Sequence, residues 1–479
     1  MGHAERTQQL REREEALEHE LRATNHAVTQ PSRESALAIS SPLDVRRLAQ
    51  TLPSGSALLE FVNLQDAVLN SAGTGAARYC AFVFAPAAGP ERESWALGAV
   101  DLGSAADIDS TVDAFRACMG GTGRGGPWRD AYGSIRGKPP AWDAAGTALR
   151  ERLWDPLVSH VGSASHLFIS LDNRLLHLPL GVLPTGEGRC LLEEHSFTYL
   201  ATAADLLRWV GAADWKAGLD VVVAAPNFNL GMRREDEGAA RNAVFSELGS
   251  AQREGKEVAE LLGVTPLLGS RALKTLVREF RAPRILHVAT HGFFFGVLGR
   301  EMEASYAAGL KPPPLGDRLR RIASGSFGFA RQSGLALAGA NTWLSHGEPP
   351  PEAENGLLTA ADIAGLDLTG TELVVLSACD TGLGHVDRPE AVVGLRGAIT
   401  AAGARTIITS LWKVPDRETR ALMLEFYRQL LAGAGRSEAL RLAQLAIKGA
   451  RPPPRYWGAF ICQGDPAPLR AAAKPGFPA

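Results

Sequence analysis

A thiol and an imidazole each follow a short apolar run in this sequence. Cys379 comes after Leu-Val-Val-Leu-Ser-Ala at 373–378, and His291 comes after Ile-Leu-His-Val-Ala-Thr at 285–290. Runs of this length and composition are typical of buried parallel strands, and ligands of open parallel sheets bind beyond the carboxyl ends of the strands. If the two strands are neighbours, the side chains meet there. An imidazole that accepts the thiol proton activates a cysteine nucleophile, so the pair predicts a cysteine peptidase.

The residues beside this pair predict the rest of a nucleophilic site. The N–H groups of Gly292 and Cys379 are candidates to bind the oxyanion, and a glycine permits close approach of a backbone or a substrate. Asp380 either orients His291 or caps the following turn, and we favour the cap because no sequence spacing places its carboxylate on the imidazole. His287 lies in the middle of its run, which favours a buried structural role.

A third apolar run, 405–410, leads to further candidates for substrate binding. We expect Ser410 and Trp412 to border the crevice, and Asp380 is a further candidate for substrate binding beside them. Asp416 is either the acidic floor of a pocket for a basic side chain or an N-cap of the helix that follows it. No G-x-S-x-G elbow supports a serine nucleophile, and no phosphate-binding loop motif occurs.

The composition predicts a cytoplasmic protein without cofactors. A net charge of −2 and the lack of a long basic block argue against nucleic-acid or membrane binding by charge alone. No run reaches the ~18 apolar residues that span a bilayer, and the start of the sequence is charged rather than signal-like. The five cysteines include no C-x-x-C pair, so we expect free thiols and no metal site. The glycines at 121–126 match G-x-G-x-x-G without the flanking strand and helix of a dinucleotide site, which favours a loop.

Strand and helix patterns alternate along most of the chain, which predicts an α/β fold with helices on both faces of a mostly parallel sheet. Strands are expected at 57–62, 79–84, 166–171, 220–224, 284–290, 372–378, 405–410 and 457–461, and helices at 108–119, 145–158, 253–262, 392–402, 417–431 and 437–448.

Four segments follow from this pattern. Residues 1–42 hold a charged helix, which either packs on a partner or is solvated, and a linker; residues 43–210 form a first α/β unit. Residues 211–470 form the unit that carries His291 and Cys379, and 471–479 are a tail. Within the second unit, residues 296–354 have two proline triplets and no regular pattern, so we expect a functional or regulated loop there.

Five ordered motifs in the second half of the chain resemble the CHAT domain. They are Leu-His-Val-Ala-Thr-His-Gly at 286–292, Leu-Val-Val-Leu-Ser-Ala-Cys-Asp-Thr-Gly at 373–382, Gly-Leu-Arg-Gly-Ala-Ile-Thr-Ala-Ala-Gly-Ala-Arg at 394–405, Ser-Leu-Trp at 410–412 and Tyr-Trp-Gly-Ala-Phe at 456–460. With flanking segments, the resemblance covers residues 165–465.

CHAT domains are caspase-like cysteine peptidases related to separase and usually associated with tetratricopeptide repeats. The resemblance implies a caspase-type fold and endopeptidase activity, with His291 and Cys379 as the dyad and Gly292 as an oxyanion donor. It also implies that residues 43–210 are an inactive protease-like half. The expected partners are a protein substrate and a regulatory or sensor protein, such as a repeat-containing one, in bacterial defence or regulated cell death.

Two departures from the family pattern leave alternatives open. The sequence has no array of ~34-residue repeats, and Ser377 stands where related basic-specific peptidases have an acid. Substrate preference therefore rests on Asp416. A non-catalytic scaffold that binds a regulator and a thiol-based acyltransferase using the same dyad are the competing functions. The arginines of the 296–354 stretch (Arg318, Arg320, Arg321 and Arg331) also make autocleavage a hypothesis.

Overall fold

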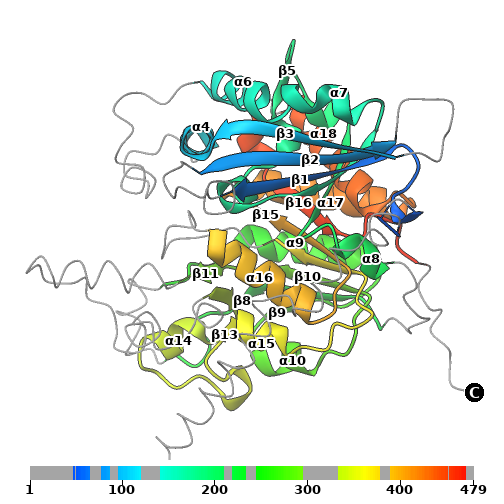
Figure 1. Cartoon of the computed structure of the whole chain (residues 1–479). Coiled ribbons are helices and arrows are strands. Elements are labelled where there is room, and N and C mark those ends of the chain that lie inside the picture. The colour runs from blue at the N-terminus through cyan, green and yellow to red at the C-terminus, as the bar shows by residue number, and fades with distance from the viewer. Residues whose placement is uncertain are drawn as a thin grey trace, which may run out of the picture. The chain divides into compact units, whose positions relative to one another are not determined.

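The fold is built on a large central sheet. The computed structural model describes residues 47–48, 50–64, 77–86, 95–119, 141–209, 218–232, 244–294, 333–377, 389–450 and 453–470. Within these residues, eleven strands form one sheet (Figure 1). Their order is β3 (Trp95–Ser104), β2 (Arg78–Pro86), β1 (Ser56–Leu64), β4 (His166–Ser170), β7 (Ser196–Leu200), β16 (Phe460–Gly464), β15 (Thr406–Ser410), β14 (Leu373–Leu376), β10 (Ile285–Ala289), β8 (Val221–Pro226) and β9 (Leu267–Gly269).

Most neighbouring strands in this sheet are parallel, as the sequence predicts. The antiparallel pairs are β1 with β2, β2 with β3, and β15 with β16. Strand β10 lies between β8 and β14 and is parallel to both, with Leu286 opposite Val221 on one side and Val374 on the other. The two apolar runs that precede His291 and Cys379 are therefore adjacent strands, which confirms that part of the prediction.

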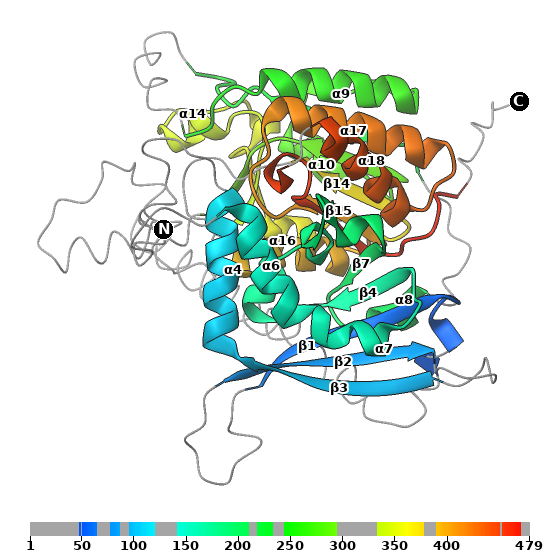
Figure 2. The ribbon, with the colours of Figure 1, turned by 90° about the horizontal axis from the view of Figure 1, so that it is seen from above.

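Helices cover both faces of the sheet (Figure 2). One face of the strands around β10 packs on α9 (Gly249–Leu262) and α17 (Asp416–Leu431), with α18 (Arg436–Ala450) beside α17. The other face packs on α15 (Ala360–Ala364) and α16 (Pro389–Ala401). Side chains alternate accordingly: Val375 belongs to the core under α9 and α17, and Val374 belongs to the core under α15 and α16. This alternation is what a strand buried on both faces requires.

The first α/β unit contributes its own helices. They are α4 (Ala105–Met119), α6 (Trp142–Leu153) and α7 (Val158–Val161). The same unit contains the short 3₁₀ turns η2 (Asp155–Leu157), η3 (Asn173–His177), η4 (Leu180–Val182) and η5 (Leu191–Glu193) and the hairpin of β5 (Pro184–Gly186) and β6 (Arg189–Cys190). Helix α8 (Asp205–Trp209) belongs to a separate compact unit, whose other described residues include 50–53.

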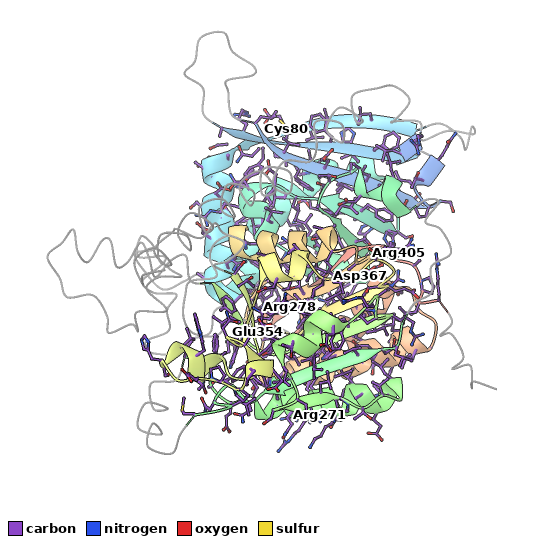
Figure 3. The ribbon with its side chains drawn as sticks, turned by 90° about the horizontal axis from the view of Figure 1, so that it is seen from below. Cys80, Arg271, Arg278, Glu354, Asp367 and Arg405 are labelled. Carbon is purple, nitrogen blue, oxygen red and sulfur yellow. The ribbon has the colours of Figure 1, made fainter. Side chains whose placement is uncertain are left out.

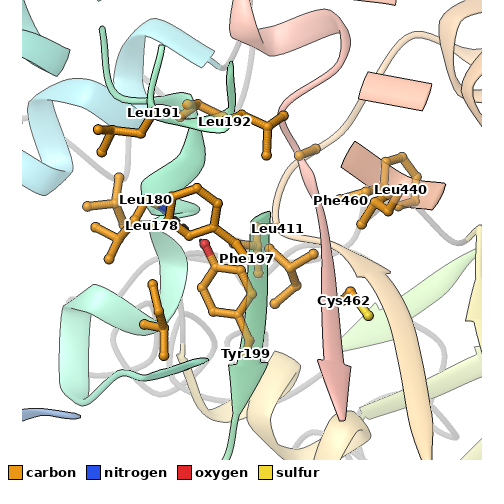
Figure 4. Close-up of a cluster of buried hydrophobic side chains, with 14 of the residues drawn as sticks. Leu178, Leu180, Leu191, Leu192, Phe197, Tyr199, Leu411, Leu440, Phe460 and Cys462 are labelled. Carbon is orange, nitrogen blue, oxygen red and sulfur yellow. Dashed lines mark hydrogen bonds between the residues drawn. The ribbon is translucent and has the colours of Figure 1, made fainter. Parts of the chain in front are cut away.

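The strands of both predicted α/β units join in one sheet at β7 and β16. Their parallel pairing places Gln463 opposite Tyr199. Around this seam Phe197, Tyr199 and Leu180 pack with residues of the second unit, among them Leu411 and Phe460 (Figure 4). Hydrophobic burial therefore continues across the boundary that we predict at residue 210.

The stretch 296–354 is not uniformly irregular, which corrects part of the sequence interpretation. From Ser333 onward it contains β12 (Ser333–Ala336), α14 (Ala340–Leu344) and η8 (Pro351–Ala353). Strand β12 lies between β11 (Gly292–Phe294) and β13 (Leu357–Thr359) in a small antiparallel sheet. Its apolar residues are few and its elements are three to five residues long, so no period is visible in the sequence.

Charged side chains attach the end of this stretch to α10 (Lys274–Glu279). Lys274 is buried and lies 3.0 Å from Asp362 and 3.5 Å from Glu354. Arg278 makes a second contact with Glu354 at 2.9 Å, and Figure 3 shows these two side chains together. A buried ammonium needs such partners, so these contacts fix residues 354–362 beside α10.

Several predicted features lie outside the described residues. They are the N-terminal helix and linker, the glycines at 121–126, the part of the 296–354 stretch before Ser333, and Cys379 with Asp380. Among the described cysteines, Cys80, Cys118, Cys190 and Cys462 are free thiols, the last two buried. No helix in the described part of the chain is long and apolar enough to cross a membrane.

Candidate active site

His291 stands at the carboxyl end of β10, directly before β11. Ala336 donates its N–H to the carbonyl of His291 at 2.9 Å, and Thr290 Oγ1 donates to the carbonyl of Ala336 at 2.5 Å. These bonds attach the end of β10 to β12. On the other side, Ser377 donates its N–H to the carbonyl of Val288 at 2.9 Å, so β14 remains beside β10 up to two residues before Cys379. The position of Cys379 itself stays a prediction.

Aromatic rings enclose the imidazole of His291. The residue is 2% exposed. Its ring centroid lies 5.8 Å from that of Phe245, with the planes 25° apart, and 5.2 Å from that of Phe228. Phe245 also contacts Phe293 of β11 at 6.3 Å. Such packing holds the plane of the imidazole and removes water from one side of it.

A backbone carbonyl determines which nitrogen of His291 carries the proton. Nε2 lies 2.8 Å from the carbonyl oxygen of Ser246. A carbonyl oxygen only accepts, so Nε2 is the donor and Nδ1 is the basic nitrogen of the neutral ring. Burial lowers the pKa of His291 from its usual range, while the bond to Ser246 opposes that shift. The ring is accordingly neutral at pH 7, the form that can accept a thiol proton.

Two charged side chains act on His291 from the segment after β15. The charge of Lys413 lowers the pKa of His291 further, and the carboxylate of Asp416 raises it. Asp416 is the first residue of α17 and is exposed, and its side chain makes no capping bond, because Pro415 occupies the N-cap position. The structure thus brings Asp416 into the electrostatic surroundings of His291, and its role as a pocket acid stays a prediction.

Ser410 and Trp412 differ in their surroundings. Ser410 ends β15, opposite Phe460, and is partly exposed. Trp412 is 4% exposed and packs in the core shared by β15, β16 and α17. Trp412 therefore supports the segment 410–416 by packing into the core. Direct contact of either residue with a substrate stays a prediction.

Gly292 starts β11 and pairs with Leu335. A Cβ atom built on Gly292 meets only the carbonyl of Gly334, at 3.9 Å, among the described residues. Ordinary van der Waals contact of this kind leaves room for a side chain, so packing within the described protein does not require glycine here. The space above the backbone is what an oxyanion donor needs.

His287 has a different role from His291. It is fully buried in β10, where Nδ1 lies 3.1 Å from the hydroxyl of Tyr427 and Nε2 lies 3.2 Å from Oε1 of Glu254. The structure confirms the predicted buried, hydrogen-bonded setting. These contacts connect β10 with α9 and α17 on the face away from α16.

Comparison with known families decides the identity of the fold. The CHAT domain model matches residues 143–465, about two thirds of the chain. The chain belongs to the CHAT domain family. This confirms the resemblance drawn from the five motifs, and it places the start of the CHAT domain within the first α/β unit, before β4.

Relatives of this CHAT domain include much longer proteins. Tetratricopeptide repeat protein 28 of Homo sapiens is 30% identical over 234 residues, which are 48% of this chain and 9% of that protein. The Mus musculus protein of the same name is 30% identical over 232 residues, again 48% and 9%. The chain therefore spans less than a tenth of the length of these relatives.

Two kinds of solved structure are similar to this CHAT domain protein. One is the Saccharomyces cerevisiae separase–securin complex, with a TM-score of 0.43 at 10% identity over 88% of this chain and 31% of that one. The other is a complex of the pro- and mature domains of Porphyromonas gingivalis RgpB, with a TM-score of 0.36 at 10% identity over 77% of both chains.

Sequence reasoning missed three contributors to the site of this CHAT domain. Lys413 is visible in the sequence next to the predicted Ser410–Trp412 stretch, and its charge was the available signal. Ser246 acts through a backbone carbonyl, which any residue type supplies. Phe245 lies 46 residues before His291 and reaches it only through the tertiary fold.

Proposed function

We propose that this CHAT domain protein is a cysteine endopeptidase that uses His291 and Cys379. The observation that carries the proposal is the state of His291. The ring is neutral, is anchored through Nε2, and ends the strand adjacent to the one that leads to Cys379. This position is the carboxyl edge of a parallel sheet, where ligands of such sheets bind.

The reaction uses the two residues in turn. Nδ1 of His291 takes the proton of the Cys379 thiol as sulfur bonds to the peptide carbonyl carbon, and the carbonyl oxygen becomes an oxyanion held by the N–H groups of Gly292 and Cys379. When the C–N bond breaks, the imidazolium returns the proton to the leaving amine. Water then attacks the thioester, His291 takes one of its protons, and the carboxylic acid leaves as the thiol is restored.

Substrate choice and regulation complete the proposal. Asp416 is the acid that favours Arg or Lys before the cleaved bond, with Ser410, Trp412 and Asp380 beside it. Residues 43–210 act as an inactive protease-like half in front of the catalytic unit. A regulatory or sensor protein gates the enzyme in the cytoplasm, in bacterial defence or regulated cell death. That two relatives are tetratricopeptide repeat proteins supports a repeat-containing partner.

The first test measures cleavage. Wild type, Cys379→Ala, His291→Ala and Cys80→Ala are incubated with a mixed peptide library, and the products are sequenced by mass spectrometry. Cys80 is a half-exposed thiol outside the site, so its variant is the matched control. We expect cleavage after Arg or Lys by wild type and Cys80→Ala and none by Cys379→Ala, with that preference lost in Asp416→Asn. Since a general base contributes about 10²–10⁴-fold, His291→Ala should be slower by that range.

A second measurement separates a gated enzyme from a scaffold. If no protein cleaves, an electrophilic peptide that alkylates Cys379 in wild type, and not in His291→Ala, supports an activated thiol awaiting its partner. Equal, slow labelling of both proteins would rule out the dyad and favour the non-catalytic scaffold. Transfer of the acyl group to an added amine, without hydrolysis, would identify the acyltransferase.

A further inference from the structure

The side chain of Asn341 is bonded to the segment that orients His291. Asn341 lies in α14 and is 1% exposed. Its Oδ1 accepts the N–H of Phe245 at 2.9 Å, and its Nδ2 donates to the carbonyl of Phe245 at 2.8 Å. One amide thus satisfies both backbone groups of a single residue, as a paired strand would.

The second amide proton of Asn341 is also used. Nδ2 donates to Oδ1 of Asn229 at 2.9 Å. Two backbone bonds fix the start of α14, because Gly339 N–H donates to the carbonyl of Asn227 at 3.0 Å and Asn341 N–H donates to the carbonyl of Phe228 at 2.9 Å. The side-chain amide of Asn341 is therefore held in one orientation, in which it presents both a donor and an acceptor to the backbone of Phe245.

Phe245 is directly followed by Ser246, whose carbonyl receives Nε2–H of His291. The ring of Phe245 stacks on the same imidazole. Asn341 consequently controls two contacts of His291 through one residue: the position of the adjoining carbonyl and the position of the stacked ring. Ser246 itself is exposed, so this stretch is restrained through Phe245, by its two bonds to Asn341 and by its buried ring.

We propose that Asn341 is a positioning residue, which fixes the Ser246 carbonyl and thereby holds His291 with the proton on Nε2 and with Nδ1 as base. This role rests on the proposed peptidase function, and it assigns a part in the site to α14, within the stretch interpreted from sequence as a loop. A displacement of about 1 Å in a catalytic group can cost on the order of 100-fold in rate.

The test compares variants that differ in these bonds. Asn341→Ala removes the amide, and Asn341→Asp keeps its shape and an acceptor for Phe245 N–H but cannot donate to the Phe245 carbonyl. Asn229→Ala is the matched control, because it removes a partner of Asn341 and leaves both bonds to Phe245 in place. Thermal unfolding of each variant reports on the fold.

Two readouts are taken for each variant. The first is the rate at which an electrophilic peptide alkylates Cys379. The second is the NMR signal of the His291 Nε2 proton, assigned among the 11 histidines with His291→Gln; a proton donated to a carbonyl is protected from exchange. Loss of packing alone would not selectively remove this signal from a folded protein.

We expect both Asn341 variants to lose the Nε2 signal and to be alkylated about 10–100-fold more slowly than wild type, and Asn229→Ala to behave as wild type. A folded Asn341 variant with the signal intact and the wild-type rate would overturn the role of Asn341. If Cys379 is alkylated no faster in wild type than in His291→Ala, the peptidase proposal fails. The Nε2 signal then still tests whether Asn341 positions His291.

Discussion

The basicity of His291 results from influences of opposite sign. Burial among Phe228 and Phe245 favours the neutral ring, and the Lys413 ammonium acts in the same direction. The Ser246 carbonyl and the Asp416 carboxylate favour the protonated ring. Because the side chains of Lys413 and Asp416 are both exposed, each charge can be neutralised without touching the aromatic packing.

Opposite shifts of the pH profile are therefore expected from two single substitutions. Asp416→Asn removes a charge that raises the pKa of His291, so the acidic limb of the Cys379 alkylation rate should move to lower pH. Lys413→Met removes a charge that lowers this pKa, so the limb should move to higher pH. Shifts in the same direction, or none at low ionic strength, would show that these charges do not act on the base.

At the scale of elements, a half-buried histidine joins two parallel strands. His166 of β4 contacts Oγ1 of Thr198 in β7 through Nε2 at 2.9 Å and packs on Phe168 at 4.6 Å. Burial lowers the pKa of His166 to about 4. The folded protein thus keeps this imidazole neutral at pH values where an unfolded chain protonates it.

Acid should weaken this junction. Between the ordinary histidine pKa of about 6.5 and the folded value, the unfolded state binds the extra proton, so stability falls as pH decreases, by up to about 3 kcal/mol. His166→Gln lacks this loss. Between pH 7 and pH 5, its unfolding temperature should therefore fall less than that of wild type. His160→Gln, at an exposed position, is the control and should follow wild type. Parallel curves for all three proteins would contradict the assignment.

Many helices and strands could be predicted from sequence patterns. The buried strands β1, β2, β4, β8, β10, β14 and β15 and the helices α4, α9, α16, α17 and α18 match the predicted segments to within a few residues. Their apolar runs and amphipathic patterns are long enough to be recognised in the sequence. Strand β16 begins at Phe460 rather than 457, because the turn η9 (Pro454–Tyr456) and the residues after it occupy that position.

Several elements that sequence reasoning missed have weak local patterns, although β7, which it also missed, is a buried strand of five residues. Strand β3 is an edge strand with glycine and polar residues, and β9, β11 and β13 have three residues each. The same applies to the site. The end of β10 was predictable from its apolar run, whereas Asn341 and the Ser246 carbonyl act through contacts between segments about 95 and 45 residues apart. No local period records such contacts.

For the whole molecule, a buried ion cluster connects the ends of several elements opposite the site. Arg436, at the start of α18, lies 2.7 Å from Glu372 before β14 and 3.3 Å from Asp465 after β16. Arg405, before β15, lies 3.0 Å from Asp465. Arg436 is 2% exposed and Glu372 1%, so neither charge is solvated.

Removing one partner should therefore be costly. Arg436→Met leaves the Glu372 carboxylate buried without its guanidinium, and we expect a loss of about 3–5 kcal/mol in the free energy of unfolding by denaturant. The exposed pair of Arg428 with Glu425 is the matched comparison, and Arg428→Met should cost under about 1 kcal/mol. The double variant Arg436→Met, Glu372→Gln should recover part of the loss. Equal effects of the two arginine substitutions would contradict this ranking.

The seam between β7 and β16 has a consequence for biosynthesis. Strand β16 is the last strand of the described chain, yet it lies in the sheet between β7 and β15. A ribosome delivers β1 to β15 before the strand that joins the two sets, and domains otherwise fold as they emerge. His291 and Cys379 are thus made well before the sheet can close. A nascent chain therefore remains without its completed sheet until Gly464 has left the exit tunnel, so the strands that position His291 and precede Cys379 have to wait for β16.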